Sequence, residues 1–221
     1  MGGNIDQWFA DLLYRLEGGH WLLKEAWVTS QLIHRGGKWL SVLASLGLIG
    51  LLLCACFNAR GHRYRRPLLY LLLAVALSTG LVSLLKSVTQ MDCPWDLSRY
   101  GGLRSFVGLF ETRPADMPAA ACFPGGHASA GYAWVALYFF ALAVRPAWRW
   151  RMLTLALLTG ATFGFGQQLR GAHFLSHDLW SLGISWLVAV SLYLWMLRPE
   201  RMHAAQAVSV PPSISTSGNL A

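Results

Sequence analysis

The sequence predicts an all-α membrane protein, a polytopic bundle of helices that crosses the bilayer several times. Of its 221 residues, 55% are hydrophobic and only 13% are charged, which is not the composition of an ordinary soluble domain. Apolar runs that approach the roughly 20 residues of a spanning helix recur along most of the chain. We therefore expect one membrane domain at 39–200, between an N-terminal cap at 1–38 and a tail at 201–221.

The first 38 residues interleave large apolar side chains with charged ones. The spacing of Phe9, Leu12, Leu13 and Leu16 predicts an amphipathic helix that lies on the membrane or caps the bundle. The segment does not resemble a signal peptide, because a basic start, an apolar core and a small-residue cleavage site do not follow in that order. A sixth span of low hydrophobicity is the alternative.

Five apolar runs predict five spans, at about 39–57, 67–85, 128–146, 152–169 and 179–197. The fourth run is the least apolar, because Gln167 and Gln168 close it and three glycines interrupt it. Small residues also suit close helix packing in lipid. A four-span arrangement is the alternative. The tail from Ala204 is rich in proline, serine and other small or polar residues, and we expect it to be disordered.

Charge placement predicts the orientation, because lysine and arginine favour cytoplasmic loops. Arginines concentrate at 58–66, at 145–151 and in the tail, so these segments are expected in the cytoplasm. The N-terminal segment and the loops at 86–127 and 170–178 then share the outer face, with nine of the ten acidic residues. Short loops and the lack of an Asn-x-Ser/Thr acceptor favour a bacterial inner membrane with this face toward the periplasm. A face toward an organelle lumen is the alternative.

Two polar stretches on the predicted outer face carry groups that suit phosphate. Gly125 and Gly126 precede a predicted helix, whose N-terminal amides attract anions, and His127 would begin that helix. Lys86 ends the preceding apolar run. Taken alone, these features fit a glycine turn with an interfacial histidine and a lysine that reaches toward the headgroups.

A third polar stretch makes a purely structural explanation of Lys86, the glycine turn and His127 less satisfactory. Arg170, His173 and His177 stand three and four residues apart and would share one face if a helix ran through them. Asp178 is adjacent and could orient an imidazole by a hydrogen bond. Together with Lys86 and His127, this cluster indicates a phosphate pocket with a nucleophile and a proton donor.

The three stretches resemble the signature motifs of the type 2 phosphatidic-acid phosphatase superfamily. Lys86 is followed after six residues by Cys93-Pro94, and the other matching segments are 123–129 and 171–176, within a resemblance that covers about residues 67–197. It implies a metal-independent membrane lipid phosphatase without a cofactor, which hydrolyses a lipid phosphomonoester or pyrophosphate through a phosphohistidine. It also implies that His173 is the nucleophile, that His127 is the general acid, and that Lys86, Gly125 and Gly126 hold the phosphate.

The chain departs from the family pattern at four places. Cys93 stands in place of an arginine, Gly125 in place of a serine, and Gly166-Gln167 in place of Ser-Arg. His177 stands in place of the aspartate four residues after His173, with Asp178 one position later. We expect Arg170 to replace the lost guanidinium and either His177 or Asp178 to orient His173. The alternative is that His177 itself is the nucleophile.

The two cysteines of the outer loop, Cys93 and Cys122, could form a disulfide in an oxidising compartment. Such a bond would tie the first motif to the second. Two free buried thiols are the alternative.

Other functions use the same residues. His127, His173, His177 and Asp178 could bind zinc. A non-catalytic lipid-binding or transport protein could use Lys86 and Arg170 to hold an anionic headgroup. A lipid phosphotransferase would share the phosphohistidine intermediate. We expect a membrane lipid phosphate as the partner and no nucleic acid, and the sequence does not choose among such lipids.

Overall fold

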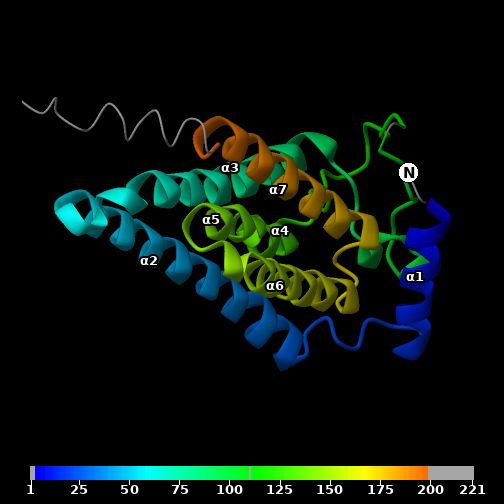
Figure 1. Ribbon diagram of the computed structural model, residues 1–221. Coiled ribbons are helices and arrows are strands. Elements are labelled where there is room, and N and C mark those ends of the chain that lie inside the picture. The colour runs from blue at the N-terminus through cyan, green and yellow to red at the C-terminus, as the bar shows by residue number, and fades with distance from the viewer. Residues whose placement is uncertain (1–2, 110, 199–221) are drawn as a thin grey trace, which may run out of the picture.

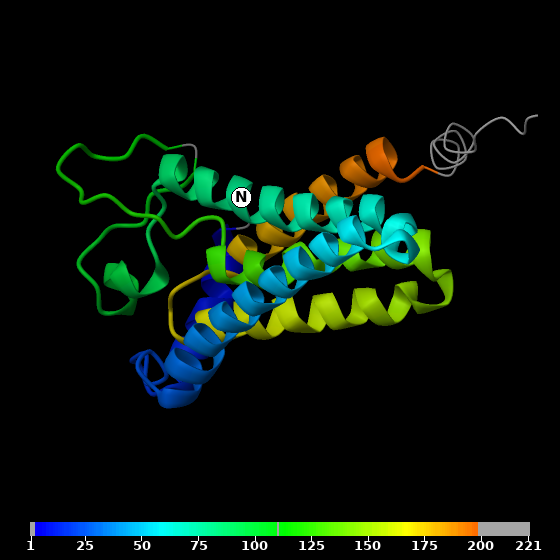
Figure 2. The ribbon, with the colours of Figure 1, turned by 90° about the vertical axis from the view of Figure 1, so that its left-hand side faces the viewer.

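A computed structural model describes residues 3–109 and 111–198. The described residues form helices and turns without a strand, and a single isolated bridge pairs Leu97 with Arg104. The bundle is elongated, and the segment between the third and fourth helices extends beyond the helix ends (Figures 1 and 2). The predicted disordered tail at 201–221 and the end of the predicted membrane domain lie outside the described residues.

Seven α-helices and several short helical turns make up the part of the chain that the structure describes. A π-helix at Val28–Gly36 leads directly into α2 (Gly37–Phe57), and a 3-10 turn at Ala133–Val135 joins α4 (Gly126–Tyr132) to α5 (Ala136–Val144). The α-helices are α1 (Gly3–Leu16), α2 (Gly37–Phe57), α3 (Arg65–Thr89), α4 (Gly126–Tyr132), α5 (Ala136–Val144), α6 (Arg149–Leu169) and α7 (Leu175–Met196).

Within the described residues, four helical stretches are long and apolar enough to cross a membrane: Val28–Phe57, Ala59–Asp96, Gly126–Val144 and Leu175–Met196. The α6 helix has 21 residues but is not among these four. Its arginines, glycines and glutamines lower its hydropathy, as the sequence indicated. Four spans are therefore supported directly, and the predicted count of five or six is not established by length and composition.

The helix that contains α2 begins earlier than the apolar pattern predicts. Its π-helical part starts at Val28, eleven residues before the expected start of the first span. The predicted boundary of the N-terminal cap at residue 38 thus falls inside a continuous helix. His34 of this extension contacts Gln167 of α6.

The α4–α5 stretch and α7 run in the same direction, and α6 returns between them. At their starts, the Gly125 amide donates to the His177 carbonyl over 3.0 Å. Toward their ends, the rings of Phe139 and Tyr193 lie 5.1 Å apart. The α6 helix packs closely on α4 (Figure 1), because a Cβ atom at Gly131 would lie 2.6 Å from the Gly160 Cα.

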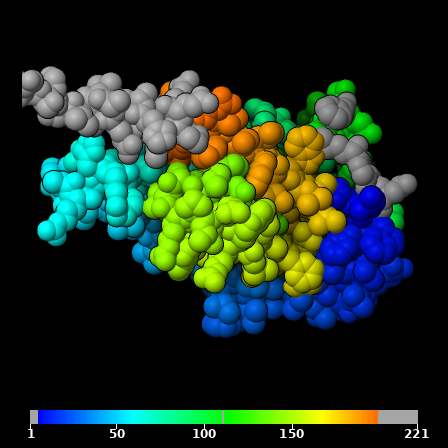
Figure 3. All heavy atoms as spheres, in the orientation of Figure 1, coloured from blue at the N-terminus to red at the C-terminus, as the bar shows by residue number. Residues whose placement is uncertain are grey.

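The α1 helix lies across the end of the bundle at which α4 and α7 begin (Figure 1) and touches the segment between α6 and α7 (Figure 3). Asp6 accepts hydrogen bonds from the amide and hydroxyl of Ser176, at 2.8 and 2.5 Å. Asp11 forms an ion pair with Arg99, which holds the pKa of the Asp11 carboxyl below its ordinary value. The α1 helix is thus fixed to the first turn of α7 and to the 3-10 turn at Ser98–Tyr100, at the same end of the bundle.

Candidate active site

The second and third polar stretches are joined through the backbone. Besides the bond from the Gly125 amide to His177, the Ser181 hydroxyl donates to the Gly125 carbonyl over 2.9 Å. The glycine turn before α4 is therefore fixed against the first turns of α7. Residues about 50 positions apart in the sequence become neighbours at one end of the bundle.

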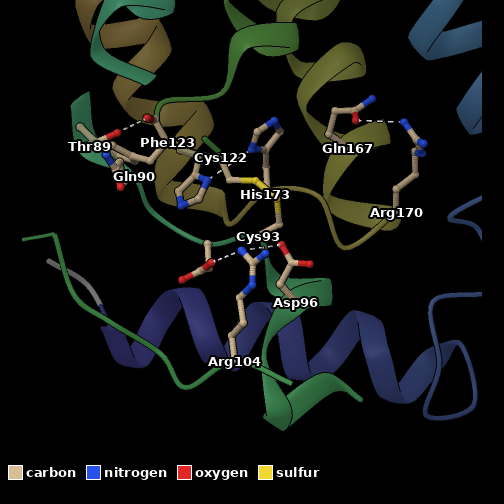
Figure 4. Close-up of a disulfide and its surroundings, with 12 residues drawn as sticks. Thr89, Gln90, Cys93, Asp96, Arg104, Cys122, Phe123, Gln167, Arg170 and His173 are labelled. Carbon is tan, nitrogen blue, oxygen red and sulfur yellow. Dashed lines mark hydrogen bonds and ion pairs between the residues drawn. A yellow bond between two sulfur atoms is a disulfide. The ribbon is translucent and has the colours of Figure 1, made fainter. Parts of the chain in front are cut away.

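Lys86 reaches the same glycine turn from the last turn of α3. A Cβ atom at Gly126 would lie 3.3 Å from the Lys86 Cδ and 3.4 Å from its Nζ. The Thr89 hydroxyl donates to the Phe123 carbonyl over 2.5 Å and holds the end of α3 beside the turn (Figure 4). All three predicted stretches thus meet, with the lysine directly against Gly126.

His127 is fixed in the first turn of α4 by contacts with α6 and with the π-helix. Its ring stacks on Phe163, with centroids 4.8 Å apart and planes at 25°. Its Nε2 atom lies 3.1 Å from the Ile33 carbonyl oxygen. Because a carbonyl only accepts, this contact places a proton on Nε2. The Nδ1 atom of His127 is then the nitrogen left for exchange with a substrate.

His173 and His177 form a buried pair of imidazoles. Their side chains are 7% and 0% exposed, and their Nδ1 atoms lie 3.3 Å apart, so one ring donates to the other. Burial, and then the neighbouring His177 and Lys86, lower the pKa of His173 well below its ordinary value. His173 is therefore neutral at neutral pH.

Asp178 does not occupy the orienting position that the sequence left open to it. Its carboxylate lies between two glycines, because Cβ atoms at Gly125 and Gly164 would fall 2.6 and 2.4 Å from its two oxygens. The Gln168 amide donates to it over 2.5 Å. Within residues 3–109 and 111–198, it is His177 that contacts the His173 ring.

Arg170 is directed away from the histidine pair, in contrast to the expectation from its spacing. Its Nε donates to the Lys24 carbonyl over 2.8 Å, and its Nη1 to the Gln167 Oε1 over 3.2 Å (Figure 4). No single helix spans 170–177, because α6 ends at Leu169, Gly171 takes the left-handed conformation with φ of 68°, and α7 begins only at Leu175. Arg170 therefore does not share a helical face with His173.

Cys93 and Cys122 form a disulfide, with Cα atoms 5.3 Å apart. The bond lies beside His173 (Figure 4). The Asp92 carboxylate next to it is held by Arg104 and Arg113, at 2.5 and 2.7 Å. The disulfide thus joins the start of the segment that follows α3 to its end, just before the glycine turn.

Removing this disulfide should destabilise the protein and leave the backbone around Cys122 less well fixed. For a closed loop of about 30 residues, the expected loss in the free energy of unfolding is about 3 kcal/mol. The double substitution of Cys93→Ser and Cys122→Ser should lower the thermal midpoint in detergent, whereas Cys54→Ser and Cys56→Ser at the two exposed free cysteines should not. Mass mapping under non-reducing conditions that finds Cys93 and Cys122 as thiols would contradict the pairing.

A cavity of about 550 Å³ opens beside the glycine turn. Four nitrogen-bearing side chains line it: Lys86 and His127, which the sequence predicted, and His34 and Lys38, which it did not. His34 and Lys38 lie four residues apart just before the first apolar run, and this helical spacing was the signal available in the sequence. The His34 and His127 ring centroids are 4.6 Å apart.

The same cavity is mainly apolar at greater depth, where the hydroxyls of Ser45 and Thr79 donate to carbonyls of their own helices. Val42 and Leu46 continue the four-residue spacing along α2, and Val75 lines it from α3. Ser41 and Ala130 also line a neighbouring, mainly apolar cavity of about 350 Å³ between α2, α4–α5 and α6. The polar end of the cavity therefore continues into a mainly apolar path between the helices.

A family model described as the PAP2 superfamily matches residues 67–201. The chain belongs to the PAP2 superfamily. Members of this superfamily are phosphatases, which hydrolyse phosphoric esters, and the long apolar helices agree with a membrane phosphatase. Searches of curated proteins and of solved structures gave no match. The matched region contains the predicted site residues but excludes His34 and Lys38.

Among the residues that the structure describes, no group of three or more His, Cys, Asp or Glu side chains is arranged to hold a metal ion. The predicted zinc set is also divided by its contacts. His127 faces the Ile33 carbonyl, whereas His173 and His177 contact each other and Asp178 contacts Gln168.

Proposed function

We propose that this PAP2 protein is an integral-membrane lipid phosphatase that cleaves a lipid phosphomonoester or pyrophosphate through a phosphohistidine, without a metal ion. The observation that supports this most directly is the cavity that combines Lys86 and His127 with a mainly apolar wall. A water-soluble phosphate ester would not need that wall. A lipid headgroup would lie near the lysine, with its chain toward Val42, Leu46 and Val75.

The depth of the cavity fits this orientation of the substrate. His34 and Leu46 are separated by twelve residues of helix, or about 18 Å at 1.5 Å per residue. Lys86 and Val75 are separated by a similar distance along α3, and Lys86 lies at the same end of the cavity as His34. The polar end would lie at the membrane surface and the apolar end within the hydrocarbon.

The proposed reaction assigns separate roles to the two histidines. With Nδ1 of His173 held by His177, the His173 Nε2 attacks phosphorus and forms an N–P bond while the bond to the lipid oxygen breaks. Protonated His127 donates a proton to that leaving oxygen. Water then attacks the phosphohistidine, His127 takes a proton from it, and phosphate leaves as His173 is restored. Lys86 and the amides of Gly125 and Gly126 would stabilise the phosphoryl oxygens.

We also propose that α6 is a fifth span. Because α4–α5 and α7 run in the same direction and follow one another in the chain, α6 must return across whatever thickness they cross. With the arginine-rich turns in the cytoplasm, the catalytic end would face outward, toward the periplasm of a bacterial inner membrane.

The activity is tested by phosphate release from phosphatidate, phosphatidylglycerophosphate, a prenyl pyrophosphate and a lipid A phosphate, with purified protein in neutral detergent. We expect release from at least one of them, unchanged by an excess of chelator. Loss of activity with chelator that returns with zinc would favour the metal hypothesis. Failure on every lipid, with binding retained, would favour a lipid-binding protein.

A further inference from the structure

We propose that Lys38 and His34, from the first membrane helix, are ligands of the substrate phosphate and replace the arginines that the family motifs contain. This inference rests on the proposed function, because it assigns the cavity beside Lys86 and His127 to a phosphate group. Both residues lie outside the segment matched by the family model, so the motifs cannot reveal them.

The positions of the two expected arginines are used for other contacts. Cys93 forms the disulfide, and Gln167 connects Arg170 with the π-helix. Arg170, the nearest guanidinium in the sequence, donates to the Lys24 carbonyl and to Gln167. The phosphate site therefore lacks both family arginines. Among the motif residues, Lys86 would then be the one cation that contacts the phosphate.

The hydrogen bonds around His34 determine how its ring can act. The Gln167 Oε1 accepts from Arg170, so the amide nitrogen of Gln167 faces the His34 Nδ1, 3.0 Å away. Because that nitrogen only donates, Nδ1 of His34 must accept. The proton of the neutral ring then lies on Nε2, which leaves a donor available to a phosphate oxygen. Arg170 and Gln167 are positioning residues in this arrangement.

Lys38 adds the positive charge. It is exposed, follows His34 by one helical turn and lines the same cavity as Lys86, which belongs to α3. None of the described residues that line this cavity carries a carboxylate. Two lysines from different helices, without an acidic neighbour in the lining, form a site for an anion with more than one negative charge, as a phosphate monoester has.

The test compares Lys38→Met with Arg35→Met, which removes a cation from the same helix at a residue outside the cavity lining. Binding of inorganic phosphate is measured by calorimetry, and KM is measured with dioctanoyl phosphatidate in neutral micelles. Lys38→Met should weaken phosphate binding and raise KM by about 10- to 100-fold, the effect of losing one charge-assisted contact. Lys38→Arg should restore most of the loss, His34→Ala should act in the same direction as Lys38→Met, and Arg35→Met should change both values by less than about 2-fold.

The outcomes separate this inference from the proposed activity. If the wild type hydrolyses the lipid and Lys38→Met behaves like Arg35→Met in both measurements, the ligand role of Lys38 is wrong and the phosphatase stands. If phosphate binding depends on Lys38 but no lipid phosphate is hydrolysed, the site stands and the proposed reaction is wrong. Wild-type protein that neither binds phosphate nor hydrolyses phosphatidate overturns this inference.

Discussion

Replacing His173 with alanine should lower lipid-phosphate hydrolysis by at least about 10³-fold, because the proposed covalent route loses its nucleophile. In rapid-quench experiments with a ³²P-labelled substrate, the wild type should carry acid-labile, alkali-stable label, and His173→Ala should carry none. His127→Ala should also reduce hydrolysis strongly while His173 remains present, because the leaving oxygen then lacks its proton donor.

His62→Ala is the matched control for these substitutions. His62 is exposed in the turn between α2 and α3 and lies outside the proposed site, so its removal should leave hydrolysis unchanged. Label that persists in His173→Ala but disappears in His177→Ala would assign the attack to His177. Hydrolysis that survives both His173→Ala and His127→Ala would refute the proposed mechanism.

The second large effect is expected at His177, which should orient His173 through the contact between their Nδ1 atoms. His177→Ala should lower kcat by about 10²- to 10⁴-fold, because the His173 ring loses the partner that fixes its tautomer. His177→Asp should recover at least about tenfold of this loss, since a carboxylate at this position can accept the His173 Nδ1 proton. A purely structural role of His177 would not give this recovery.

The pH profile gives a second readout of the same contact. An introduced carboxylate favours the imidazolium form of His173 and so raises its pKa. Because only neutral His173 can attack, the acidic limb of the kcat/KM profile should move to higher pH in His177→Asp than in the wild type. A limb that stays in place, with an unchanged thermal midpoint, would show that His177 does not act on His173.

Much of the helical bundle could be predicted from local composition, because a spanning helix shows itself as a run of apolar residues. The early start at Val28 could not. Its polar side chains lower the hydropathy of the segment, and its Ile33 carbonyl is contacted by His127, which is 94 positions away. The number of spans also depends on α6, whose glycines serve close packing and lower its hydropathy at the same time.

The site shows a similar division between local and long-range information. Motif spacing was enough to select Lys86, His127 and His173, and the structure brings their three stretches together. Spacing could not distinguish His177 from Asp178, since adjacent helical residues differ by about 100° in direction. Spacing also could not show that the left-handed conformation of Gly171 prevents Arg170 and His173 from sharing one helical face. Whether the selected residues perform their assigned roles stays a prediction.

The change in polarity along the cavity has a consequence for turnover. In the proposed reaction, one substrate gives two products of opposite solubility, a lipid alcohol and inorganic phosphate. The apolar end beside Val42 and Leu46 offers the alcohol a lateral exit into the bilayer, whereas the polar end at Lys38 and Lys86 releases phosphate toward water. The products would separate into two phases, so phosphate accumulating in the aqueous compartment should compete with substrate more effectively than the diluted alcohol.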